Sequence, residues 1–284
     1  MLKYSEFKNK LEFSQVNTLP QYLVEKLLTF GNKQPKYNNV VIMMGGGASG
    51  KGYVLNNLVG LEGVVFDVDK LKSLSLRSIK IRKKVLELTG KDVSTLDLKK
   101  PEDVTFLHNI IGELGIMDKK LNTFLNAVFS TEYKPNIIFD VTLRDLSKLD
   151  NIYHQVTEFG YKRENIHLVW VVNDIETALI QNLERERSVD SNILISTHRS
   201  VATTANLILN KTVSISNYVG GDFWIVFNKR GIDSLTKFSD KGGFYIKDAL
   251  YIKVKDQYQE IKDLSEISDE ILDKLEQYTQ TKFR

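Results

Sequence analysis

Short apolar runs recur along the chain, and each is too short to form an isolated helix. They are rich in β-branched or aromatic residues. The five runs comprise residues 40–44, 64–66, 137–139, 167–172 and 223–227. Continuous apolar runs of this length are typical of strands that are buried on both faces of a parallel sheet.

The segments between these runs carry apolar residues at helical spacing. The helical patterns cover residues 53–59, 77–89, 102–130, 145–159, 174–187 and 197–210. Strands that alternate with helices predict a doubly wound α/β domain, which we assign to residues 38–232. Residues 1–37 are expected to form a helical lead-in, because Leu19, Leu23 and Leu27 recur at helical spacing.

The pattern changes beyond this domain. Residues 242–254, GGFYIKDALYIKV, predict a β-hairpin, and residues 265–280 predict an amphipathic helix. We treat residues 233–284 as a C-terminal appendage of hairpin plus helix, and not as an independent domain.

Composition narrows the functional classes. The 284 residues include no cysteine, which excludes disulfides, thiolate metal sites and a cysteine nucleophile. The net charge is +3, from 39 basic and 36 acidic residues, and this balance does not favour a nucleic-acid partner. Because the sequence shows neither a signal-like segment nor an apolar run long enough to span a bilayer, we expect a soluble, cytoplasmic protein without membrane contact.

The stretch GGGASGKGY, residues 45–53, lies between the first run and a helical pattern. Its spacing fits a phosphate-binding loop, in which glycines let backbone amides turn towards an anion at a helix N-terminus. The predicted nucleotide-binding residues are Gly45, Gly47, Ser49, Gly50, Lys51, Gly52 and Tyr53. Gly52 stands where a Ser or Thr hydroxyl usually binds Mg²⁺. The alternative is a glycine-rich turn that serves only geometry.

Acidic residues follow two of the predicted strands. Asp67 and Asp69 come after the second run, and Asp140 comes after the third, with Thr142 and Arg144 close behind. Ligands of open α/β sheets lie at the carboxyl ends of the strands. Asp140 is therefore a candidate Mg²⁺ ligand, and a carboxylate after the second strand is a candidate general base. Each Asp alone is also compatible with a helix cap or a turn.

Several basic residues are further candidates for the functional site. Arg185, Arg187 and Arg199 are placed to clamp a transferring phosphate, or else to complement helix dipoles. The basic stretch 77–84 fits either phosphate contacts to nucleic acid or a solvated helix face. His198, beside Arg199, is the histidine that we expect near the site.

Taken in order, these pieces resemble the zeta-toxin family of P-loop kinases, and the resemblance covers roughly residues 38–232. The matching pieces are GGGASGKG (45–52), FDVDKLK (66–72), IIFDVTLRD (137–145), LERERS (183–188) with STHRSV (196–201), and FWIVFNKRG (223–231). The resemblance implies a P-loop NTPase or kinase-type parallel sheet flanked by helices. Two departures stand out, namely Gly52-Tyr53 in place of the hydroxyl position and Asp140 where family members often carry Glu-Gly before the Thr.

The resemblance also implies an activity. The family transfers the γ-phosphate of ATP, with Mg²⁺, to a hydroxyl of a small substrate such as a UDP-N-acetyl sugar. By this likeness Lys51 binds phosphates, Asp69 is the catalytic base, and Arg187 or Arg185, with Arg199, closes on the nucleotide. Asp67, Thr142 and Arg144 resemble substrate-pocket residues. A toxin role implies an antitoxin-like protein partner.

Two other functions remain open from the sequence. The first is a nucleotide or 5′-polynucleotide kinase, which would have the same fold but a different phosphate acceptor. The basic stretch 77–84 supports this alternative. A nucleotide-binding, non-catalytic protein with a structural or regulatory role in an assembly is supported by Gly52-Tyr53.

Overall fold

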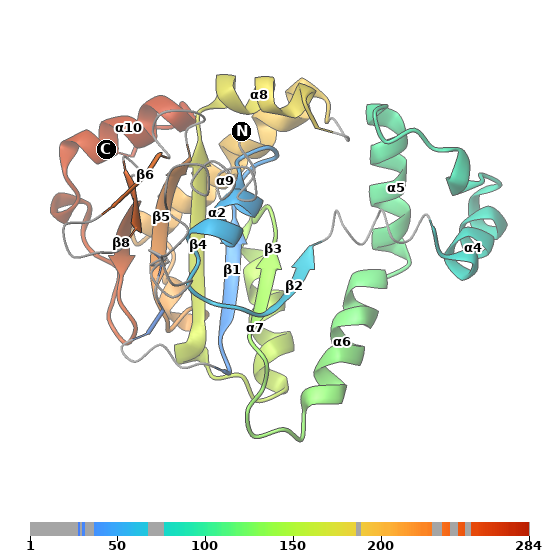
Figure 1. Cartoon of the computed structure of the whole chain (residues 1–284), viewed down its shortest axis with the longest axis horizontal. Coiled ribbons are helices and arrows are strands. Elements are labelled where there is room, and N and C mark those ends of the chain that lie inside the picture. Colours follow the sequence, from blue (N-terminus) through green and yellow to red (C-terminus); the bar gives the residue numbers. More distant parts are fainter. Residues whose placement is uncertain are drawn as a thin grey trace.

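The computed structural model describes residues 28, 30–31, 37–67, 77–185, 189–228, 235–238, 244–247 and 251–283. A six-stranded sheet in the order β2-β3-β1-β4-β5-β8 forms its centre (Figure 1). Strands β1 to β5 run parallel, and β8 pairs antiparallel with β5. The strands are β1 Val40–Met44, β2 Val64–Asp67, β3 Ile137–Asp140, β4 Ile166–Asn173, β5 Phe223–Asn228 and β8 Tyr251–Lys255.

Four of the five predicted parallel strands are buried on both faces, as the sequence indicates. In β1, Val40, Ile42 and Met44 join the core on one side of the sheet, while Val41 and Met43 join the core on the other. Strand β2 differs, because it lies at the edge of the sheet and exposes Val64 and Val65 to 39% and 43%. The prediction of burial on both faces is wrong for this strand.

Helices cover both faces of the sheet (Figure 1). The helices of the described residues are α2 Lys51–Asn57, α4 Ile79–Thr89, α5 Pro101–Glu113, α6 Ile116–Val128, α7 Leu146–Glu158, α8 Ile175–Leu183, α9 Ser191–Leu209 and α10 Asp269–Thr279. Short 3₁₀ turns lie at Val93–Thr95, Arg163–Asn165, Ile215–Asn217 and Leu264–Glu266. The mostly parallel sheet between helices confirms the predicted α/β fold class.

Two helices depart from the sequence pattern. The predicted helix 102–130 is two helices, because Gly115 takes a left-handed conformation with φ of 56° and ends the first one. Helix α9 begins six residues before the predicted 197, because the Asp190 side chain accepts hydrogen bonds from the amides of Asn192 and Ile193 and caps the helix.

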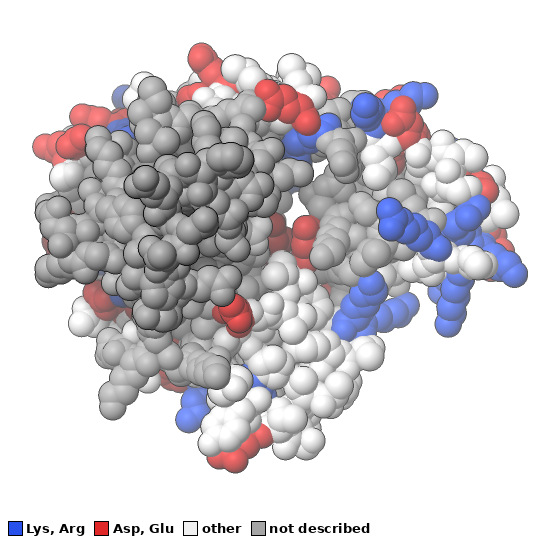
Figure 2. Space-filling model, viewed as in Figure 1, with Lys and Arg blue, Asp and Glu red and all other residues white. Residues whose placement is uncertain are grey.

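Helices α4, α5 and α6 form an arm between β2 and β3, which we call the helical arm (residues 77–128; Figure 1). Its outer part has a small core of its own around Val85, Leu107 and Ile111, whereas Leu121 and Leu125 of α6 belong to the main core. Figure 2 shows Lys and Arg side chains gathered on this arm. Residues 77–100 contain eight basic and three acidic side chains. The positive charge of the chain is therefore concentrated on the arm.

The C-terminal part contains an antiparallel strand pair, as expected, but the two strands differ from those predicted at residues 242–254. Strands β6 Leu235–Phe238 and β7 Phe244–Lys247 pair antiparallel. Strand β8, which the sequence pairs with β7, adds instead to the edge of the main sheet beside β5. Helix α10 buries Leu272 and Leu275 in the main core. The domain boundaries remain predictions, although β8 and α10 are built into the same sheet and core as residues 38–228.

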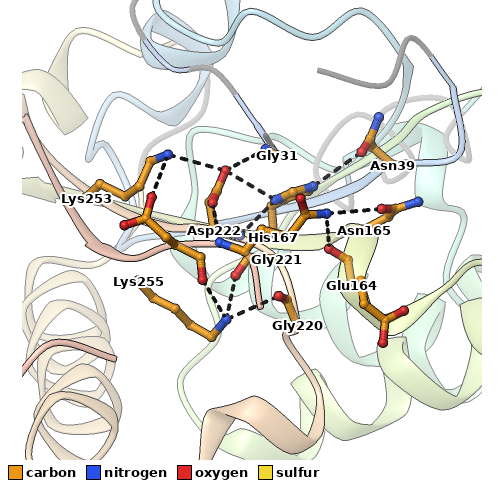
Figure 3. A network of polar contacts seen from close by, with 12 residues as sticks. Gly31, Asn39, Glu164, Asn165, His167, Gly220, Gly221, Asp222, Lys253 and Lys255 are labelled. Atoms are coloured by element: carbon orange, nitrogen blue, oxygen red, sulfur yellow. Dashed lines mark hydrogen bonds and ion pairs between the residues drawn. The ribbon is translucent and has the colours of Figure 1, made fainter. Parts of the chain in front are cut away.

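A buried polar network holds β8 and Gly31 against the sheet (Figure 3). Asp222 accepts hydrogen bonds from the amides of Gly31 (2.7 Å) and Gln257 (2.8 Å). Its own amide donates to His167 Nδ1 at 2.9 Å. Lys255 Nζ donates to backbone carbonyls, including that of Gly221 at 2.8 Å. Because buried charges are costly unless they are hydrogen-bonded, this network fixes the position of β8.

The predicted helical lead-in 1–37 falls almost wholly outside the described residues. Leu28 within it is described, and it forms an isolated parallel bridge with Val59. Among the described residues, none of the helices combines the length and apolar character that crossing a bilayer requires.

Candidate functional site

A cleft of about 680 Å³ opens at the carboxyl ends of β1, β2 and β3. The loop after β1, the turn after β3, helix α5 of the helical arm and the end of α8 contribute its walls. The lining residues are Gly47, Ala48, Ser49, Gly50, Lys51, Gly52, Asp67, His108, Asp140, Val141, Thr142, Leu143, Arg144, Asp145, Lys148, Gln181, Glu184 and Arg185. The cleft lies where open α/β sheets bind their ligands.

The loop 45–52 has the backbone of a phosphate cradle. It runs from the end of β1 to helix α2, which begins at Lys51. Gly50 is left-handed, with φ of 88°, and a Cβ at this position would lie 1.9 Å from Asn228 Nδ2. Ala48 is also left-handed, with φ of 54°. These turns bring the N-terminus of α2 to the cleft, where its first amides have no partner within the helix.

Lys51 lies over the mouth of this loop. Its Nζ donates to the carbonyls of Gly45 (2.9 Å) and Gly46 (3.2 Å) and lies 3.6 Å from Asp140 Oδ1. The side chains of Lys51 and Asp140 are only 13% and 21% exposed. A cation at the start of α2 and a carboxylate at the end of β3 are thus held together at the loop.

The two described carboxylates of the strand ends come together as predicted. Asp67 and Asp140 are register partners in the parallel pair β2–β3, and both line the cleft. Asp69, the candidate base, lies outside the described residues, as does Arg187. Arg185 is described and lines the cleft from the turn after α8, because that helix ends at Leu183.

The turn after β3 brings two further predicted residues to the cleft. Thr142 and Arg144 both line it, and between them Leu143 is buried in a left-handed conformation, with φ of 54°. The Thr142 carbonyl accepts a hydrogen bond from the Gly45 amide at 3.3 Å, which ties this turn to the loop. Asp145 caps α7, and the hydrogen bond from the Ser147 hydroxyl lowers the pKa of its carboxyl.

Three predicted site residues among those described do not line the cleft. Tyr53 is not part of the cleft lining, and its ring packs against the core beneath α2. Arg199 donates a hydrogen bond to Gln280 at 2.8 Å and also lies away from the lining. Gly45 supports the loop through its amide and carbonyl and does not line the cleft itself.

Sequence reasoning missed several residues of the cleft. His108, Lys148, Gln181 and Glu184 all line it. His108 belongs to α5 of the helical arm, so the arm forms one wall. His108, Lys148 and Gln181 come from helices α5, α7 and α8, whose polar positions carry no motif. Glu184 lies in the turn after α8, within the piece LERERS, but it was not singled out there.

His198 lies at the loop, as the sequence indicates. Its Nε2 is 2.7 Å from the Gly47 carbonyl, so this nitrogen carries the proton and donates. Burial lowers the pKa of the His198 imidazole, and the nearby Lys51 lowers it further, while the bond to Gly47 and the charge of Asp174 act in the opposite direction.

The residues of the cleft fit a nucleoside triphosphate. The Ser49 hydroxyl is buried and has no hydrogen-bond partner among the residues that the structure describes, and Ser49 lines the cleft. A phosphate oxygen would satisfy it. A volume of about 680 Å³ is in the range of small-molecule sites.

The same cleft fits Mg²⁺ if phosphate oxygens and water complete the coordination of the ion. No group of three or more metal-ligating side chains occurs among the described residues. Mg²⁺ at phosphate sites, however, usually takes one or two carboxylates and completes its shell with phosphate oxygens and water. Asp140, which lines the cleft beside Lys51, matches this requirement.

Comparison with known proteins shows likeness in fold. No family model matches the sequence, and no curated protein matches it. A chain of the AvrRxo1-ORF1:-ORF2 complex with ATP is 14% identical, with a TM-score of 0.47, over 87% of this chain and 65% of that chain. A structure of the PezAT chromosomal toxin–antitoxin system of Streptococcus pneumoniae is 15% identical, with a TM-score of 0.43, over 81% of this chain and 79% of that chain.

These matches cover most of this chain at low identity. This chain spans slightly less than two thirds of the length of the matched AvrRxo1 complex chain.

Proposed function

We propose that this protein is an ATP-dependent phosphotransferase that moves the γ-phosphate to a hydroxyl group of a small substrate. One observation carries the proposal. Lys51 Nζ lies at the mouth of the loop and 3.6 Å from Asp140 Oδ1, in a cleft at the carboxyl ends of the strands. A cation and a carboxylate beside a loop of this shape are the parts that phosphoryl transfer requires.

The loop side of the cleft would hold the nucleotide. In the free protein the Lys51 ammonium rests on the carbonyls of Gly45 and Gly46. Phosphate oxygens are better partners for an ammonium than neutral carbonyls, so Lys51 would turn towards them on binding. Bound ATP supplies the phosphoryl group, and Mg²⁺ offsets the charge of its phosphates. Asp140 would hold the metal ion, and Arg185, with Arg187, would neutralise further charge.

Asp67, Thr142 and Arg144, which line the same cleft, would hold the acceptor. In the proposed reaction an acceptor hydroxyl oxygen forms a bond to the γ-phosphorus while the bond from phosphorus to the ADP oxygen breaks. Asp69 would take the hydroxyl proton. The zeta-toxin resemblance of the sequence supports a UDP-N-acetyl sugar as acceptor and an antitoxin-like protein as partner.

The experiment that tests this function is transfer of label from [γ-³²P]ATP, with Mg²⁺, to a panel of acceptors. The panel contains UDP-sugars, nucleosides, nucleotides and 5′-hydroxyl oligonucleotides, and Lys51→Ala provides the blank. We expect label in the UDP-sugars with the wild-type protein and none with the variant. Equal labelling by Lys51→Ala, or labelling of no acceptor, would contradict the proposal.

Two outcomes would favour the other functions. Label in oligonucleotides that disappears when Lys80, Lys83 and Lys84 are neutralised would favour a polynucleotide kinase, because these side chains lie exposed on α4. Tight ATP binding without any transfer would favour a non-catalytic nucleotide-binding protein. Gly52 supports the latter, since α2 begins without the hydroxyl that usually binds Mg²⁺.

A further inference from the structure

Three consecutive carbonyls of the phosphate loop each accept a hydrogen bond from a buried side chain. His198 Nε2 donates to Gly47 O at 2.7 Å, Asn173 Nδ2 to Ala48 O at 3.1 Å, and Asn228 Nδ2 to Ser49 O at 2.9 Å. The three donors come from α9, the end of β4 and the end of β5. They are 7%, 1% and 6% exposed. Elements far apart in the sequence thus hold one short stretch of backbone.

We infer that His198, Asn173 and Asn228 position the loop for phosphate binding, and we call them the loop clamp. The inference rests on the proposed function. A trans peptide group is planar, and its C=O and N–H point in opposite directions. A carbonyl held towards the clamp therefore directs the next amide away from it. This applies to the amides of Ala48 and Gly50, which belong to residues that line the cleft.

The clamp also explains two glycines of the loop. A Cβ on Gly46 would lie 2.3 Å from His198 Cδ2, and a Cβ on Gly50 would lie 1.9 Å from Asn228 Nδ2. Real Cβ atoms do not approach other atoms this closely. Two clamp side chains are therefore packed directly against the loop at glycine positions, and they support its shape as well as its hydrogen bonding.

The energetic role of the clamp follows from preorganisation. Carbonyl oxygens that turned into the cleft would repel phosphate oxygens, and the loop would have to rearrange before it could bind them. A loop that is already held in the binding geometry avoids this cost. The clamp residues are positioning residues, because they contact the loop backbone on the side away from the phosphates.

The test compares substitutions that remove the donors without adding charge. Asn228→Leu and His198→Phe keep approximate size and remove the hydrogen bond, whereas His198→Gln keeps an N–H donor near the position of Nε2. Asn39→Leu is the matched control, since Asn39 is a buried asparagine (0% exposed) at the opposite end of β1 that bonds to Asn136. It should cost comparable stability without touching the loop.

The readouts are the dissociation constants of ATP, tripolyphosphate and adenosine, and the melting temperature of each variant. We expect Asn228→Leu and His198→Phe to weaken ATP and tripolyphosphate binding by about tenfold or more, in line with the loss of one buried hydrogen bond. Adenosine binding should stay unchanged. His198→Gln should restore most of the phosphate affinity, and Asn39→Leu should leave it intact.

The outcomes separate this inference from the proposed function. Suppose that the wild-type protein binds ATP and transfers phosphate, but the clamp variants bind tripolyphosphate as tightly as the wild type. The inferred role of the loop clamp is then refuted, while the proposed function stands. The role is also refuted if Asn39→Leu weakens phosphate binding as much as Asn228→Leu, because the weaker binding then reflects a general loss of stability. If the wild-type protein binds neither ATP nor tripolyphosphate, both are wrong.

Discussion

The Lys51 ammonium lies 3.6 Å from the Asp140 carboxylate, although Lys51 begins helix α2 and Asp140 ends strand β3. Strands β1 and β3 are neighbours, with Met43 in register with Asp140, and the loop that follows β1 leads to Lys51. Asp67 is the register partner of Asp140 on the other side. Strand pairing thus sets the positions of the two carboxylates, and the loop after β1 sets the position of the cation.

The placement of Asp140 predicts its effect on metal dependence. Asp140→Asn should raise the Mg²⁺ concentration for half-maximal transfer by about tenfold or more, because the variant loses a charged ligand. Asp145→Asn is the matched control, since Asp145 also lines the cleft but is occupied as the cap of α7. A Mg²⁺ titration of the transfer rate checks this. An unchanged Mg²⁺ requirement in Asp140→Asn would rule out the assigned role.

Gly52 can be tested by adding the hydroxyl that this loop does not have. A Cβ at Gly52 would meet no atom within 4 Å, so Gly52→Ser should fold normally. We expect it to lower the Mg²⁺ requirement of transfer several-fold, roughly as one added metal ligand would. Gly50→Ser is the contrasting variant, because left-handed φ and the contact with Asn228 forbid its side chain. It should lose ATP binding. Loss of activity in Gly52→Ser would contradict this account of the loop.

The burial of His167 leads us to expect that the protein loses stability in acid. Burial, with the charges of Lys255 and Lys253, lowers the pKa of the His167 imidazole to about 3. The unfolded chain binds a proton near its ordinary pKa of about 6.5, whereas the folded chain does not. Stability should therefore fall between about pH 6.5 and pH 3, by at most about 1.4 kcal/mol per pH unit from this group.

Urea unfolding at several pH values measures that slope. His167→Gln should reduce it. A slope that is identical in wild type and His167→Gln would show that other groups dominate acid unfolding.

The hydrogen bonds of Asp222 lead us to expect that its substitution lowers the free energy of unfolding. It accepts from two backbone amides, and an asparagine can offer only one acceptor oxygen to them. Asp222→Asn should therefore reduce the free energy of unfolding by about 3 kcal/mol, as for other broken buried charge networks. Asp263→Asn should cost less than about 1 kcal/mol, because its side chain is 64% exposed. Equal losses in the two variants, measured by urea unfolding, would refute the role of the network in holding β8.

The sequence predicted the strand positions and the loop well, because these depend on local pattern. The run 40–44 is β1 without any shift, and Lys51 begins α2 after Gly50. The C-terminal pairing was not predictable in this way. An alternating strand pattern does not state its partner, so β7 was expected to pair with β8 and instead pairs with β6.

The part of the candidate site that depends on local sequence pattern was also predicted. Asp67, Asp140 and Thr142 follow apolar runs, and their place at the strand ends follows from the pattern. The loop clamp could not be read from the sequence, since Asn228 and Ser49 are 179 positions apart. An asparagine at a strand end carries no motif. His108 was likewise missed, because the direction of α5 depends on the break at Gly115.

The central claim is that residues 45–52 bind phosphate groups, and a comparison of ATP with adenosine tests it most directly. Calorimetric titration of the wild-type protein should show ATP binding at least about tenfold tighter than adenosine, since the loop and Lys51 contact only the phosphates. In Lys51→Ala this difference should largely disappear while the melting temperature stays the same. Equal affinity for ATP and adenosine in the wild-type protein would show that the loop is only a turn between β1 and α2.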